Sequence, residues 1–92
     1  MKNGEILTLY ETLNRLTENK DLKFNVSVGY ILAKNKAKIK QEALIIYDLR
    51  RQIILEHGTI ENSDIIVPKE YVNEVNQKIN ELMNIENDIQ LQ

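Results

Sequence analysis

Four lysines at alternate positions are the most conspicuous side chains with binding chemistry: Lys34, Lys36, Lys38 and Lys40. Lysine ammonium groups bind anions such as phosphate. On a helix, however, alternate residues lie about 200° apart, so Lys34 pairs with Lys38 on one side and Lys36 with Lys40 on another. Nucleic-acid-binding helices usually present one continuous basic face, whereas this chain has a net charge of −2. We therefore expect these lysines to solvate a helix and do not expect nucleic acid as a partner.

A tyrosine stands one helical turn before the first of these lysines. Tyrosine rings can stack on nucleobases, and a lysine beside the ring can neutralise a phosphate. Each tyrosine also lies near an apolar position of its helix, which favours core packing with the hydroxyl at the rim. If a small anionic nucleotide binds, we expect it to contact Tyr30, Lys34 and Lys38.

The chain lacks the residue sets of the common catalytic and metal sites. It has no cysteine and one histidine, His57, and its three glycines are isolated, so no glycine-rich phosphate loop is present. We expect His57 to lie in the last turn of a helix, where the helix dipole favours it, with a catalytic or ligand role as the alternative. The expectation is a protein without enzymatic activity, cofactor or bound metal.

These side chains belong to a segment that we predict to be one long helix, residues 25–57. No glycine or proline interrupts it between Gly29 and Gly58, and strong helix formers fill it. A helix of about 30 residues is about 45 Å long. We expect Gly58 to end it in the left-handed conformation typical of helix C-caps.

The long helix has apolar residues on opposite faces. One face carries the larger aliphatic residues, which repeat every seven positions as in a coiled coil: Leu32, Ile39, Ile46 and Ile53, with Val28 and Ala43. The opposite face carries Tyr30, Ala33, Ala37, Leu44 and Leu55. A helix that is apolar on both sides needs neighbours on both sides. The candidate interface residues are Leu32, Ile39, Ile46, Arg50 and Ile53.

Two shorter helices are predicted around the long one, at about residues 3–18 and 68–83. Asn3 is the expected N-cap of the first, Pro68 suits the first turn of the last, and Asn84 is expected to cap its end. Residues 22–28 alternate between apolar and polar types. We favour an extended entry into the long helix here, with a short strand as the alternative.

Small β elements are predicted near the C-terminal end. Two β-prone arms flank a polar turn within residues 59–67, which indicates a hairpin. Residues 86–91 alternate and read as a terminal strand whose natural partner is 64–67. The fold class is therefore mainly α, with three helices around a long central one and a small accessory β hairpin and terminal strand.

Length and charge bound the class of protein. Ninety-two residues form one domain, which at this size is often supplemented by oligomerisation. Residues 1–40 carry eight Lys or Arg and four Asp or Glu, whereas residues 41–92 carry four and ten. The halves are therefore +4 and −6, for which ordinary solvation of two surfaces is the simpler interpretation and head-to-tail contact between copies the alternative. No apolar run approaches the roughly 18 residues of a membrane span, and the first residues lack the apolar core of a signal peptide.

Three segments resemble a known group of proteins: KNGEILTLYETLNRL, VGYILAKNKAKIKQE and ELMNIENDIQL. They are similar to small proteins of unknown function encoded by tailed phages and prophages of Gram-positive bacteria. The matching positions are 2–5, 30–35 and 82–86. The resemblance implies a phage accessory role, structural or counter-defence, in the cytoplasm of a bacterial host. It carries over no functional residues.

We expect a non-enzymatic accessory protein that forms homo-oligomers and acts as a protein–protein interaction module with a host or phage partner. The alternative is an oligomeric sponge or inhibitor that binds a small anionic nucleotide or a host defence component. Nucleic-acid binding is the least favoured, and no membrane association is expected.

Overall fold

The computed structural model describes residues 1–21 and 23–92. Over these residues the chain is mainly helical, with three α-helices and a two-stranded antiparallel hairpin, as predicted. The elements in order are α1 (Asn3–Glu18), α2 (Val26–Leu55), β1 (Thr59–Glu61), β2 (Asp64–Ile66), the short 3-10 helix η1 (Lys69–Tyr71) and α3 (Val72–Met83).

Helix α2 starts after an asparagine cap. Oδ1 of Asn25 accepts a hydrogen bond of 2.8 Å from the backbone N–H of Val28, which satisfies one of the free donors of the first turn. Residues 23–25 precede the helix without forming a strand, and 26–28 are helical. The alternative of a strand over 22–28 is therefore wrong for residues 23–28, and residue 22 lies outside the described part.

The 30 residues of α2 reach along most of the 52 Å length of the molecule. Among the helices in residues 1–21 and 23–92, none combines the length and hydrophobicity that a membrane crossing requires. The four lysines and two arginines of α2 account for this in the longest helix.

Gly58 follows the end of α2 but does not take the predicted left-handed conformation. Its backbone N–H donates to the carbonyl of Ile54 at 2.9 Å, so the chain stays close to the last turn. A Cβ at this position would lie 2.8 Å from the Ile54 oxygen and 2.9 Å from Cγ2 of Ile65. Glycine is needed here because the hairpin packs against the helix end, and not because φ is positive.

The predicted N-cap of α1 is also corrected. Lys2 occupies the cap position, and its backbone N–H donates to Oε1 of Glu5 at 2.8 Å. Asn3 is the first helical residue and is buried. Its Nδ2 donates a hydrogen bond of 2.9 Å to the carbonyl of Leu82. The asparagine serves a tertiary contact with α3 rather than the end of its own helix.

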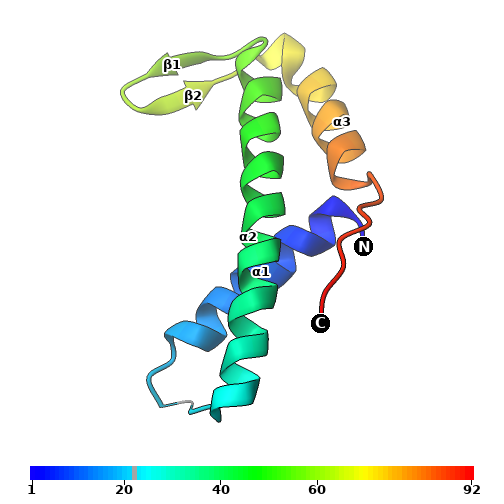
Figure 1. Ribbon diagram of the computed structural model, residues 1–92. Helices are drawn as coiled ribbons and strands as arrows, with labels where there is room; N and C mark the ends of the chain where they lie inside the picture. The colour runs from blue at the N-terminus through cyan, green and yellow to red at the C-terminus, as the bar shows by residue number, and fades with distance from the viewer. Residues whose placement is uncertain (22) are drawn as a thin grey trace.

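Helices α1 and α3 both contact α2, and all three meet in one core (Figure 1). Lys36 donates to Oγ1 of Thr17, and the Tyr47 hydroxyl donates to Oε1 of Glu11, so α1 crosses α2 with its C-terminal end toward the N-terminal half of α2. The core is formed by Ile6, Leu7, Ile39, Ala43, Ile46 and Leu82. Apolar residues on one side of α2 therefore contribute to the core with both shorter helices.

The hairpin projects from the upper end of α2 in Figure 1. Ile60 pairs with Ile65 and Glu61 with Asp64 across the strands. The connecting residues Asn62 and Ser63 both have positive φ, 49° and 71°, as a two-residue type I′ turn requires. The hairpin predicted for 59–67 is therefore present.

The predicted strand over 86–91 is absent from this part of the structure, apart from one isolated bridge between Lys2 and Glu86. Helix α3 leads the chain away from β2, so the tail ends far from that strand and lies beside α1 and α2 (Figure 1). Asn35 of α2 holds it through two hydrogen bonds of 2.9 Å to the backbone of Gln92. The alternation instead turns Ile89 toward the core.

Candidate interaction surfaces

The predicted interface residues lie mostly in the core of the single chain. Ile39 is fully buried and Ile46 is 2% exposed. Leu32 and Ile53 are half-buried, and Arg50 is exposed. The stripe with the seven-residue repeat is therefore covered by α1 and α3, and Ile39 and Ile46 are not accessible to a partner in this structure.

The opposite side of α2 is exposed. We call it the outer face, and it consists of Val26, Tyr30, Ala33, Ala37 and Leu44. These residues are spaced by three, four or seven positions, so they share one side of the helix. Tyr30 is 63% and Leu44 is 53% exposed, and both alanines are exposed. The outer face is an apolar strip in contact with solvent over residues 26–44, interrupted by the exposed Lys40 and Gln41 between Ala37 and Leu44.

The placement of the other elements explains this exposure. Helix α1 crosses behind α2 in Figure 1, whereas α3 and the tail lie on its right. None of the α2 residues that hydrogen-bond to α1 or to the tail belongs to the outer face: Asn35, Lys36, Lys38, Glu42 and Tyr47. The sequence placed Tyr30, Ala33, Ala37 and Leu44 on this face but not Val26, and the predicted Leu55 is half-buried. It did not indicate which of the two faces the chain would leave open.

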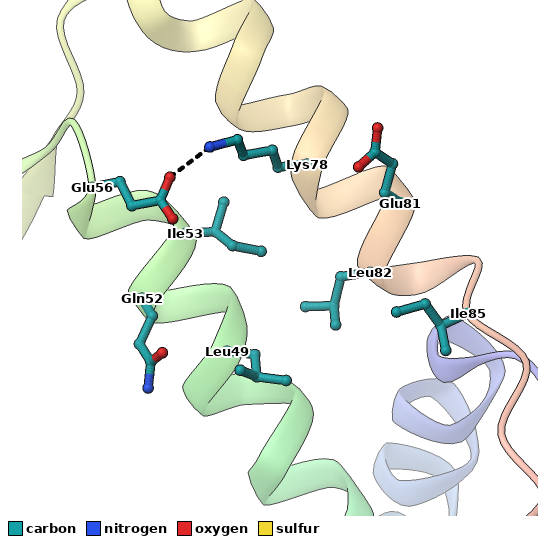
Figure 2. A pocket seen from close by; sticks show the side chains of 8 residues that line it. All are labelled: Leu49, Gln52, Ile53, Glu56, Lys78, Glu81, Leu82 and Ile85. Atoms are coloured by element: carbon teal, nitrogen blue, oxygen red, sulfur yellow. Dashed lines mark hydrogen bonds and ion pairs between the residues drawn. The ribbon is translucent and has the colours of Figure 1, made fainter.

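A second apolar surface is the groove between α2 and α3, with a volume of about 530 Å³. Leu49 and Ile53 of α2 point toward Leu82 of α3, and Ile85 borders the lower end (Figure 2). Leu49 is 40% and Ile85 is 54% exposed. The groove is a shallow apolar hollow on a different side of α2 from the outer face.

Charged side chains form the upper rim of the groove. Nζ of Lys78 lies 2.7 Å from Oε2 of Glu56, and the pair bridges the two helices (Figure 2). The hydrogen bond and charge of Lys78 lower the pKa of Glu56, and Glu56 in turn raises the pKa of Lys78. Both side chains are solvent-exposed, so this bridge contributes little stability and mainly sets the charge at the rim.

The three predicted nucleotide contacts do not form one site. Nζ of Lys34 lies over the ring of Tyr30, 5.4 Å from its centroid, which is a cation–π contact. Lys38 instead donates to the backbone carbonyl of Gln90 at 3.1 Å. Lys38 therefore binds the tail, and only the Tyr30–Lys34 pair is arranged as predicted.

His57 lies beyond the last residue of α2 rather than in its last turn. Its ring stacks on Tyr71 with centroids 4.2 Å apart and an interplanar angle of 5°. Nε2 of His57 is 3.3 Å from Oε2 of Glu74. The histidine joins the ends of α2 and α3, a role that sequence reasoning missed because the partners are more than ten positions away.

Two further polar side chains of α2 have partners within the chain. Oδ2 of Asp48 accepts a hydrogen bond of 3.0 Å from Gln52. Tyr47 is half-buried, and burial together with the carboxylate of Glu11 raises its pKa. Tyr47 thus packs with its hydroxyl at the rim, as predicted for the tyrosines, whereas Tyr30 is exposed.

Within residues 1–21 and 23–92, no group of three or more His, Cys, Asp or Glu is placed to hold a metal ion. No protein-family model, curated protein or solved structure matches this chain.

Proposed function

We propose that this protein is a non-enzymatic interaction module that self-associates through the outer face of α2. In keeping with its short motif resemblance, we place it among phage-type accessory proteins that bind a host or phage protein. The observation that carries the proposal is the exposure of Val26, Tyr30, Ala33, Ala37 and Leu44 on a helix whose opposite face, with Ile39, Ala43 and Ile46, is buried in the core.

The energetic argument follows from area. Removing apolar surface from water contributes about 25 cal/mol per Å². A large aliphatic or aromatic side chain contributes most to the free energy of association when a partner covers it in a well-packed interface. Val26 is 90% exposed and Tyr30 and Leu44 are each more than half exposed, so a second surface has substantial apolar area to cover.

The groove between α2 and α3 supports the interaction role in a second way. Leu49 and Ile53 face it from a side of α2 that the outer face does not include. A partner that covered the outer face would therefore leave the groove open. Its apolar floor and charged rim resemble the core-and-rim composition of protein interfaces.

The nucleotide-binding alternative has less support. Tyr30 and Lys34 are adjacent, but Lys38 is engaged with the backbone of Gln90. The remaining pair is open to solvent on one helix face, without the concave enclosure typical of small-molecule sites.

The proposal is tested by measuring mass in solution for matched glutamate variants of α2. Leu44→Glu places a charge on the outer face, whereas Leu49→Glu places the same charge on the groove side of the same helix. We expect wild type and Leu49→Glu to self-associate in multi-angle light scattering and Leu44→Glu to be monomeric. Circular dichroism of both variants checks that the helices are retained.

Equal masses for Leu44→Glu and wild type would contradict the role of the outer face. Loss of association in Leu49→Glu alone would transfer the interface to the groove.

A further inference from the structure

We propose that the outer face binds the outer face of a second copy in antiparallel orientation, about a two-fold axis that passes between Lys40 and Gln41. This inference rests on the proposed function and specifies its partner and register. Helix α2 runs from Val26 to Leu55, so that axis lies at its midpoint and the two helices overlap along their full length.

The register matches large residues with small ones. Ala37 lies level with Leu44 of the second copy, and the same contact is repeated by symmetry on the other side of the axis. The small side chain lets the two helix backbones approach, and the leucine fills the space that results. At the helix ends, Val26 lies level with Leu55 of the second copy.

The charge distribution along α2 favours the antiparallel direction. All four lysines of the helix lie in its first half, at positions 34, 36, 38 and 40, and no acidic residue accompanies them there. Lys36 and Lys38 donate to Thr17 of α1 and to the tail, so Lys34 and Lys40 are the lysines beside the outer face. A parallel pair would place each of these two level with the same lysine of the second copy, which is unfavourable for like charges. In the antiparallel pair the lysine half of one helix lies beside the half that contains Asp48, Arg50 and Arg51. Asp48 is the acidic residue of that half beside the outer face, since Glu42 accepts a hydrogen bond from Asn87 of the tail.

Individual contacts follow from the same register. Lys34 is level with the turn of the second copy that contains Asp48, on the same flank of the interface, so an ion pair can form. Tyr30 is level with Arg51 of the second copy. A guanidinium near an exposed tyrosine ring forms a favourable cation–π contact. Asp48 and Arg51 are both exposed in the single chain.

Disulfide crosslinking tests orientation and register directly, because the chain contains no cysteine. In the proposed pair, Gln41 lies next to Gln41 of the second copy at the axis. Two copies of Ala37, or two copies of Leu44, are seven residues apart along the axis, about 10 Å, which is too far for a disulfide. The three variants are Gln41→Cys, Ala37→Cys and Leu44→Cys.

We expect Gln41→Cys to form a covalent dimer under mild oxidation, and neither of the other variants to do so alone. An equal mixture of Ala37→Cys and Leu44→Cys should give the mixed dimer. A parallel pair would crosslink each of the three variants with itself, and a register centred on Ala37 would crosslink Ala37→Cys. Either pattern, or failure of Gln41→Cys to crosslink, would overturn the inference.

The mass of wild type separates this inference from the proposed function. A dimer in light scattering with the wrong crosslinking pattern contradicts the register alone, whereas a monomer contradicts both.

A charge exchange gives an independent measurement. Lys34→Asp and Asp48→Lys should each weaken the dimer severalfold, and the double variant should recover most of the loss, since it restores the ion pair in reversed form. Additive losses in the double variant would contradict the predicted contact.

Discussion

The side-chain amide of Asn87 donates hydrogen bonds of 3.2 Å to Oδ1 of Asn3 and to Oε2 of Glu42, so one residue of the tail joins the start of α1 to the middle of α2. Asn3 in turn donates to the carbonyl of Leu82, and its backbone N–H donates to the carbonyl of Ile85. The two ends of the chain are therefore tied together through buried or half-buried amides rather than through a strand.

We predict that Asn3→Ala destabilises the protein by about 1–3 kcal/mol, because the buried Leu82 carbonyl and the Asn87 amide lose a partner. Asn73→Ala is the control, since Asn73 is an exposed asparagine of α3. Urea unfolding followed by circular dichroism measures both. An Asn3→Ala loss no greater than that of the control would show that these hydrogen bonds do not hold the termini.

The core side of α2 should be far more sensitive to truncation than the hairpin. Ile39→Ala removes atoms from a fully buried side chain and is expected to cost about 2–5 kcal/mol. Ile60→Ala makes the same chemical change at a residue that is 56% exposed, and it should cost less than about 1 kcal/mol. Similar losses at the two positions would mean that the covered face of α2 is wrongly placed.

Two glycines provide a matched pair for backbone space. Gly58→Ala would bring its Cβ within 3 Å of the Ile54 carbonyl and of Ile65, so we predict a loss of stability and displacement of the hairpin. Gly29→Ala lies within α2, and its Cβ would meet nothing within 4 Å, so it should stabilise the helix by up to about 1 kcal/mol. Thermal unfolding of both variants shows whether the signs are opposite, as predicted.

The rim ion pair predicts a specific pH dependence. The pKa of Glu56 in the folded protein is below its ordinary value of 4.5, so its contribution is complete above that value and is lost as the pH falls through the lowered pKa. The pKa of Lys78 is raised above 10.5, so its contribution is complete below that value and is lost as the pH rises through the raised pKa.

The stability difference between wild type and Lys78→Met should therefore shrink as the pH is lowered below 4.5. Lys69→Met is the control for loss of a surface lysine. The comparison is made by urea unfolding at low ionic strength, because salt screens an exposed pair. A difference that stays constant down to pH 3 would show that the pair does not form in solution.

The sequence predicted the helix boundaries closely because local signals set them. Asn25 caps α2, and the polar turn at Asn62–Ser63 sets the hairpin. Local signals did not decide which face of α2 is covered, since both faces carry apolar residues with helical spacing. That choice depends on α1 and α3 together: Ile39 and Ile46 are buried by them, whereas Tyr30 and Leu44 are not.

The tail could not be placed from its alternation for a similar reason. Its partners are Asn35, Lys38 and Glu42 on α2 and the first residues of α1, all distant in sequence. An alternating pattern predicts an extended chain with one apolar side, and the tail does turn Ile89 toward the core. Side chains of a helix supply its hydrogen bonds in place of a neighbouring strand.

The central claim is that this chain covers the outer face of α2 with another copy of itself. Light scattering of the wild type over a wide range of concentrations measures this most directly. We predict a mass that rises to twice the 10.8 kDa of the chain as concentration increases. A mass that stays at 10.8 kDa up to millimolar concentration would contradict the account.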